Sequence, residues 1–120
     1  MKIRLISTAA SVVALVGALA SPVVFSGSHG NMVAEGKKIA FDRKLGNCIA
    51  CHQIAGGTAP GNIGPPLIAM KARFPDKAKL RAQIWNASES NPNSIMPPFG
   101  RHGILTEKQI DAVLEFVYSL

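Results

Sequence analysis

Two cysteines and a histidine form the most chemically specific pattern in this chain. They stand together as Cys48-Ile49-Ala50-Cys51-His52, and the sequence contains no other cysteine. Two thiols at this spacing lie on one turn, where each can add to one vinyl group of a haem. The adjacent histidine can then bind the iron from one face. The motif predicts one covalent haem c, with thioethers from Cys48 and Cys51 and His52 as an axial ligand.

Three other uses of this cysteine pair agree less well with the sequence. A thioredoxin-like redox site needs a strand–helix setting, which the sequence does not predict. A disulfide would enclose only Ile49 and Ala50 and would constrain the chain little. A zinc site would lack its remaining ligands.

The iron has a second axial position, for which several side chains are candidates. These are His29, Met32, Met70, Met96 and His102. Met96 is the predicted ligand, because it stands in a long loop where Pro97 and Pro98 stiffen the backbone and can aim its thioether. Met70 is expected in the core, and His102, Met70 or an open site are the alternatives. Histidine–methionine ligation raises the reduction potential, which favours electron transfer over O₂ or peroxide chemistry.

Two further residues are candidates for supporting roles around the haem. The Pro65 carbonyl, in a Gly-Pro-Pro-Leu sequence, can accept the N–H of His52 and set its orientation, although a plain turn is the alternative. Trp85 can line the haem and direct its N–H to a propionate, or it can belong to the ordinary core.

The elements that position these residues are predicted to be helices, since no segment alternates like a strand. The first runs over residues 32–45, with Asn31 as its cap and Gly46 at its end. A short helix is expected around 67–74 and another from Pro75 to about Asn86. The last opens with a Thr106–Gln109 capping box and repeats apolar residues at 110, 113, 114 and 117. Long Gly/Pro-rich loops fill 55–66 and 88–103, which gives an all-α domain.

One glycine inside the first predicted helix calls for a packing reason. Gly36 costs about 1 kcal/mol relative to alanine in a helix interior. We expect it to let the first helix cross the last one closely, near Phe116.

The N-terminal segment has the pattern of a secretory signal peptide. Lys2 and Arg4 precede an apolar run that closes on Ala18-Leu19-Ala20, which predicts cleavage after Ala20. The run is short for a membrane span. We therefore expect a signal peptide at 1–20, a flexible lead-in at 21–31, a haem domain at 32–120, a periplasmic location and no membrane anchor after cleavage.

Composition narrows the function classes further. The 120 residues carry a net charge of +6, two units of which leave with the signal peptide. The basic residues are dispersed and no nucleic-acid motif is present, so no nucleic-acid partner is expected. One basic run is either a docking surface for an acidic partner or an ordinary solvated helix face. It comprises Lys71, Arg73, Lys77, Lys79 and Arg81.

Together these motifs resemble class I cytochromes c, and several stretches resemble the SoxX family of monohaem cytochromes. The matching stretches are 46–48 with 51–52, 56–57, 60–67, 73–76, 80–86, 91–92, 96–102 and 104–107. The resemblance covers essentially all of the chain beyond the signal peptide. It implies the class I cytochrome c fold, with Cys48 and Cys51 holding the haem and His52 and Met96 as axial ligands.

The resemblance also implies partners and a reaction. SoxX pairs with SoxA, and this heterodimer oxidatively joins thiosulfate to a cysteine of the SoxYZ carrier protein. The chemistry at sulfur belongs to SoxA, whereas SoxX passes the electrons to a further cytochrome. A free-standing shuttle cytochrome and a haem enzyme such as a peroxidase are the competing hypotheses.

Overall fold

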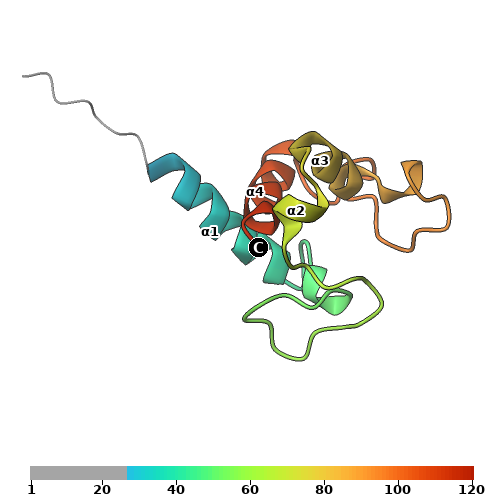
Figure 1. Ribbon diagram of the computed structural model, residues 1–120, viewed down its shortest axis with the longest axis horizontal. Coiled ribbons are helices and arrows are strands. Elements are labelled where there is room, and N and C mark those ends of the chain that lie inside the picture. Colours follow the sequence, from blue (N-terminus) through green and yellow to red (C-terminus); the bar gives the residue numbers. More distant parts are fainter. Residues whose placement is uncertain (1–26) are drawn as a thin grey trace, which may run out of the picture.

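The computed structural model describes residues 27–120, and the described residues form helices joined by long loops, without a strand (Figure 1). The elements in chain order are α1 (Gly27–Phe41), the 3-10 turn η1 (Cys48–Ala50), α2 (Met70–Arg73), α3 (Lys77–Trp85), the 3-10 turn η2 (Ala87–Glu89) and α4 (Glu107–Tyr118). The all-α prediction is confirmed. The predicted signal peptide at 1–20 and the first part of the lead-in lie outside the described residues.

The two terminal helices, α1 and α4, form the largest interface between elements (Figure 1). Gly36 makes their crossing possible, since a Cβ there would lie 1.9 Å from the Ala112 carbonyl oxygen and 2.9 Å from Phe116 Cβ. The rings of Phe41 and Phe116 meet edge to face beside this contact, 6.1 Å apart between centroids. The predicted role of Gly36 is confirmed.

The bounds of α1 differ from the prediction at both ends. The helix begins at Gly27, so Asn31 lies inside it and is not its cap. It ends at Phe41 because Asp42 starts a turn, in which the Asp42 carboxylate accepts the Lys44 N–H at 2.8 Å. Aspartate side chains compete with helical hydrogen bonding in this way. Gly46 then closes the turn by donating its N–H to the Ile39 carbonyl at 3.1 Å.

The remaining helices follow their local signals with small shifts. The helix α3 begins at Lys77 rather than at Pro75, because the Asp76 carboxylate caps it by accepting the Ala78 N–H at 2.9 Å. The helix α2 is shorter than predicted. The Thr106–Gln109 capping box that opens α4 is present in full.

The core lies between α1, α3 and α4, with α2 at one side of it (Figure 1). Its buried members include Ile39, Ala40, Met70, Leu80, Ile84, Ile110, Val113, Phe116 and Val117. The predicted apolar stripe of α4 is therefore confirmed. None of the helices within residues 27–120 combines the length and apolar character needed to cross a bilayer.

Candidate functional site

The C-x-x-C-H motif folds into one compact turn beside the end of α1. Asn47, with a left-handed φ of 45°, leads into η1. The N–H groups of Cys51 and His52 both donate to the Cys48 carbonyl, at 3.2 and 2.9 Å. The two thiols are free, since no disulfide joins them. This turn therefore presents both cysteines and the histidine from one short segment, as haem attachment requires.

A cavity of about 660 Å³ opens beside this turn, and its wall is mostly apolar. Cys48, Cys51, His52 and Met96 all line it, although the sequence separates the motif from Met96 by more than forty residues. Buried side chains such as Leu80 and Val113 form part of its wall. A cavity of this size and character is typical of a cofactor site.

The orientation of His52 is set by a backbone carbonyl, as predicted. Its Nδ1 lies 2.7 Å from the Pro65 oxygen, which can only accept, so Nδ1 carries the proton. Nε2 is then the nitrogen left to bind a metal. Gly64 allows this close approach, because a Cβ there would lie 2.5 Å from His52 Cε1. The predicted role of Pro65 is confirmed.

The segment that carries Pro65, residues 61–67, is bound along the haem motif by backbone hydrogen bonds. The bonds run from the N–H of Gly61 to the Ile49 carbonyl at 2.9 Å, from Gly64 to Cys51 at 2.8 Å and from Leu67 to Gln53 at 2.9 Å. A Cβ on Gly61 would lie 1.9 Å from the Ala50 oxygen. The glycines of this segment therefore serve its close approach to the motif.

Of the candidates for the second axial position, only Met70 and Met96 line the cavity. Met96 is half-buried, and its loop is ordered by bonds such as that from its N–H to the Ser94 hydroxyl at 3.3 Å. Met70 is 2% exposed and its sulfur accepts an N–H from Arg73 at 3.5 Å. His29 is occupied elsewhere, 3.3 Å from the Glu115 carboxylate. Met96 stays the predicted ligand, with Met70 confirmed as a core residue.

Burial changes the chemistry of one of the two thiols. Loss of solvent raises the pKa of Cys48 from its ordinary value of 9.0 to about 11, and the neighbouring Cys51 adds to the rise. A hydrogen bond from its backbone lowers the pKa in part. Cys48 is therefore a neutral thiol at physiological pH in the folded chain.

Trp85 lies where its second predicted role, as an ordinary core residue rather than a haem-lining one, would place it. Trp85 is not among the residues that line the cavity. Its ring packs on Gly100, where a Cβ would lie 2.0 Å from Cε3, and the Arg81 guanidinium stands 5.7 Å from the ring centroid. The indole thus supports the loop that carries Met96.

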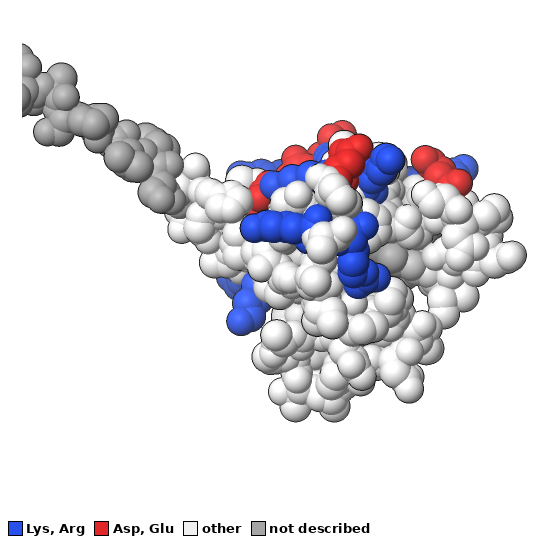
Figure 2. Space-filling view, in the orientation of Figure 1, with Lys and Arg blue, Asp and Glu red and all other residues white. Residues whose placement is uncertain are grey.

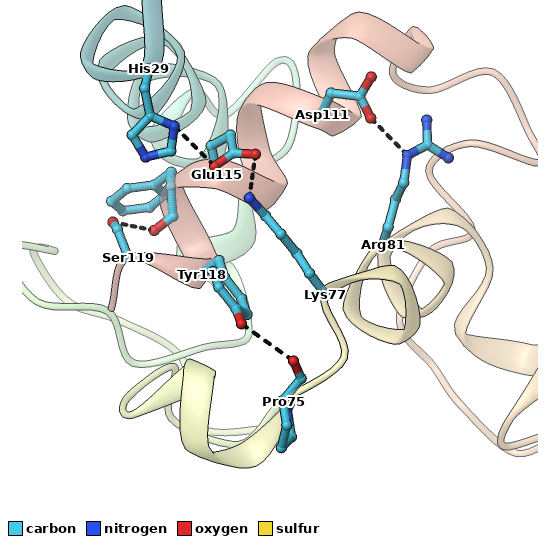
Figure 3. A network of polar contacts seen from close by, with 9 residues as sticks. His29, Pro75, Lys77, Arg81, Asp111, Glu115, Tyr118 and Ser119 are labelled. Carbon is cyan, nitrogen blue, oxygen red and sulfur yellow. Dashed lines mark hydrogen bonds and ion pairs between the residues drawn. The ribbon is translucent and has the colours of Figure 1, made fainter. Parts of the chain in front are cut away.

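Most of the basic run is engaged within the molecule. Lys77 pairs with Glu115 of α4, and Arg81 pairs with Asp111 at 2.7 Å (Figure 3). Glu115 also faces His29, so that one carboxylate connects α4 with both α1 and α3 (Figure 3). The ammonium of Lys71 stands 5.7 Å from the Tyr118 ring centroid. These contacts favour an ordinary helix face that stabilises the fold.

Sequence reasoning missed an uncharged face that the two long loops form on one side of the cavity, away from Arg43 and Arg73, which also line it. No charged residue occurs in 53–70 or in 90–100, and the loops at the base of the molecule form a face free of Lys, Arg, Asp and Glu (Figure 2). Three exposed isoleucines line the cavity from these loops or next to them: Ile63, Ile95 and Ile104. The two uncharged stretches were the signal that could have revealed this face.

The family model described as "Cytochrome c" matches residues 33–120 of this chain. The chain belongs to the cytochrome c family. Membership in this family implies a covalently bound haem c, and Cys48 and Cys51 are the only cysteines of the chain.

Two individual proteins are similar to this cytochrome. A chain in the crystal structure of SoxXA from P. pantotrophus superposes with a TM-score of 0.65 at 32% sequence identity, over 72% of this chain and 79% of that one. This match supports the resemblance to the SoxX family. An uncharacterized lipoprotein from Aquifex aeolicus is 36% identical over 79 residues, which are 63% of this chain and 37% of that protein. The cytochrome thus spans little more than a third of the length of this curated relative.

Proposed function

We propose that this cytochrome is the SoxX-type electron-transfer subunit of a heterodimer with a SoxA-type cytochrome. One observation carries the proposal: the two cysteines, the carbonyl-oriented His52 and the thioether of Met96 all line one apolar cavity. The similarity to a chain of SoxXA supports the choice of this family among cytochromes.

Four side chains of this chain fit the cofactor. Cys48 and Cys51 would hold a single haem c through two thioethers, and His52 Nε2 and the Met96 sulfur would be the ligands of its iron. When bound, the haem supplies one-electron redox chemistry. The donor set agrees with this role, because an imidazole and a thioether are ligands typical of electron-transfer haems.

The surrounding residues tune and protect this site. The Pro65 carbonyl fixes the His52 tautomer and makes the imidazole a more basic ligand for a metal. The apolar wall excludes water and lowers the local dielectric constant. When the haem is bound, the soft Met96 thioether would favour its reduced state and raise the reduction potential. With His52 and Met96 both holding the iron, the site would favour electron transfer over O₂ or peroxide chemistry.

The proposed reaction sets the number of electrons that this cytochrome must accept. Joining thiosulfate to a cysteine of the SoxYZ carrier forms one S–S bond, releases the thiol proton and liberates two electrons. The bond forms on the SoxA-type partner, and this cytochrome receives the electrons one at a time. It then passes them to a downstream cytochrome. We place this reaction in the periplasm, as the predicted signal peptide requires.

Co-purification tests the proposal directly. The cytochrome is expressed with the cytochrome encoded beside it, and the expected product is a stable 1:1 complex with one haem c on this chain. Thiosulfate and the carrier together should reduce this haem, whereas thiosulfate without the carrier should not. A monomer that forms no complex would instead identify a free-standing shuttle cytochrome.

A further inference from the structure

The segment 61–67, which orients His52, lacks backbone N–H hydrogen bonds at its two prolines. Gly64 donates its N–H to Cys51 of the haem motif and Leu67 donates to Gln53 directly after it, but Pro65 and Pro66 between them have no N–H to donate. The Pro65 carbonyl is already bonded to His52. The only remaining backbone group of the proline pair is the Pro66 carbonyl.

Arg73 binds this remaining carbonyl. Its Nη1 donates to the Pro66 oxygen at 2.7 Å, a length typical of a strong hydrogen bond from a charged donor. The same nitrogen lies 3.5 Å from the Met70 sulfur. The Arg73 side chain thus joins the proline pair to α2 and also lines the cavity.

The backbone of Arg73 is held in place by α2, so its side chain can hold the Pro66 carbonyl in a fixed position. Arg73 is the last residue of α2, and its N–H donates to the Ala69 carbonyl at 3.1 Å. Met70, at the start of this helix, is 2% exposed and belongs to the core. The path from the core to His52 therefore runs through α2, the guanidinium of Arg73 and the two proline carbonyls.

Arg73 differs from its basic neighbours in what it binds. Lys77 and Arg81 pair with carboxylates of α4. Within residues 27–120, Arg73 has no carboxylate within ion-pair distance, and its guanidinium contacts an uncharged carbonyl and a thioether. An arginine held on neutral groups beside the cavity is not explained by pairing of surface charges.

We propose that Arg73 is a positioning residue for the haem ligand His52, because it holds the Pro65–Pro66 backbone in the place from which Pro65 accepts the His52 Nδ1–H. The inference rests on the proposed function, in which His52 binds the haem iron. Hydrogen bonds weaken steeply as their angle and length depart from the optimum. Release of the Pro66 carbonyl would therefore loosen the bond to His52 without removing any atom of that bond.

Exchange of the His52 Nδ1–H with deuterium measures this bond in the intact holoprotein. Its proton signal is followed by NMR after transfer to D₂O, in the wild type and in Arg73→Met, Arg73→Gln and Arg73→Lys. Methionine keeps an unbranched apolar stem but has no N–H donor. Lysine keeps a charged donor at nearly the same reach, and glutamine has a neutral donor on a side chain as short as that of methionine. Lys79→Met, on the exposed face of α3, is the control for loss of one positive charge.

We expect Arg73→Met to exchange at least about tenfold faster than the wild type, since weaker bonding opens the N–H to solvent more often. Arg73→Lys should restore slower exchange, Arg73→Gln should restore it less because its amide reaches less far, and Lys79→Met should match the wild type. The EPR spectrum of ferric Arg73→Met should also change, because it responds to the orientation of the imidazole.

Exchange in Arg73→Met within about twofold of the wild type, with an unchanged EPR spectrum, would overturn the proposal. So would equal acceleration in Arg73→Met, Arg73→Lys and Arg73→Gln, since the donor would then not matter. If Arg73→Met does not fold, the lysine and glutamine variants decide, because the proposal requires Arg73→Lys to exchange more slowly than Arg73→Gln. Absence of covalent haem from the wild type would instead refute the proposed function, and its absorption spectrum shows this first.

Discussion

At the scale of single residues, the reactivity of the Cys48 thiol depends on the fold. Cys48 packs against the hydrophobic core, and burial raises its pKa to about 11. In an unfolded chain the same thiol would ionise near 9.0. Because the thiolate is the reactive form, the folded environment protects this thiol from alkylation and oxidation.

The haem-free chain tests this protection. At pH 9 about half of an exposed thiol is ionised, against about one hundredth of a thiol with a pKa of 11. We expect iodoacetamide to alkylate Cys48 at least tenfold more slowly in buffer than in guanidinium chloride, as followed by peptide mass spectrometry. The sign of the pH dependence is fixed, because the folded state keeps its proton between pH 9 and 11 and loses stability as the pH rises through that range. Equal rates in the two solvents would mean that the turn around Cys48 forms only after haem attachment.

The two thioethers of the cavity have separate predicted roles. In the holoprotein, Met96→Leu should abolish the thioether–iron absorption band and lower the reduction potential, because the soft ligand is lost. Met70→Leu should keep the band and cost less than about 1.5 kcal/mol of stability, as a substitution that conserves core volume. Absorption spectra and potentiometric titration distinguish the two. Loss of the band in Met70→Leu alone would transfer the ligand role to Met70.

At the scale of elements, the site depends on how closely α1 crosses α4. The motif follows α1 by a turn anchored on Ile39, and the buried face of α4 supplies part of the cavity wall. Gly36 sits where these two helices meet, in contact with backbone rather than with a flexible side chain. Backbone cannot yield as a side chain can, so the crossing distance is sensitive to one methyl group.

Gly36→Ala is therefore expected to destabilise the holoprotein by about 1–3 kcal/mol or more through overpacking. Gly30→Ala is the matched control, because Gly30 lies in the same helix and a methyl group added there would meet nothing within 4 Å. The free energy of unfolding of that variant should rise by up to about 1 kcal/mol, because alanine has a higher helix propensity than glycine. Guanidinium unfolding of both variants gives the two values. A Gly36→Ala protein as stable as Gly30→Ala would show that α1 and α4 can separate freely.

The cap of α4 is a second element-scale feature with a measurable effect. Thr106 and Gln109 bond reciprocally at the first turn, with the Gln109 N–H donating to the Thr106 hydroxyl at 3.3 Å. Thr106→Ala should lower the free energy of unfolding by about 1 kcal/mol. Thr58→Ala, in an exposed loop, should leave it nearly unchanged. A loss in Thr58→Ala as large as that in Thr106→Ala would contradict the capping explanation.

At the scale of the whole molecule, most charge lies away from the two long loops at the cavity. Lys, Arg, Asp and Glu gather over the helices, whereas residues 53–70 and 90–100 carry none (Figure 2). Arg43 and Arg73 are the charged residues that line the cavity. Ile95 and Ile63 on these loops are 74% and 67% exposed. A redox partner that approaches the cavity from the side of these loops would meet an apolar surface without charged side chains.

Under the proposed function, binding of the SoxA-type partner should depend weakly on salt. We expect its Kd to change less than about threefold between about 20 and 500 mM salt, because little charge is screened at such an interface. Ile95→Glu should weaken the complex more than tenfold, and Lys79→Glu should leave it within about twofold. Calorimetric titration measures all three values. A steep salt dependence, or a larger effect of Lys79→Glu, would show that the basic run is the docking surface.

Much of the site could be predicted from the sequence because its signals are local. The C-x-x-C-H motif occupies one turn, the proline carbonyl follows thirteen residues later, and the α4 cap and stripe need only nearest neighbours. The ends of the helices were predicted less accurately than their presence. The Asp42 and Asp76 carboxylates accept backbone N–H groups at these ends, and hydrophobic periodicity does not show such bonds. For that reason α1 ends before Leu45 and α3 begins after Pro75.

The sequence by itself determined the haem attachment motif, the helical class and the family resemblance, since each rests on residue type and short spacing. Only the tertiary structure decided that Met96 and Met70 share one cavity, that Arg73 binds the Pro66 carbonyl and that two uncharged loops meet on one side of the cavity. These facts depend on segments far apart in the chain that meet through the packing of α1, α2 and α4. Contacts between distant segments follow from the shape and burial of whole helices, and a local sequence pattern does not predict them.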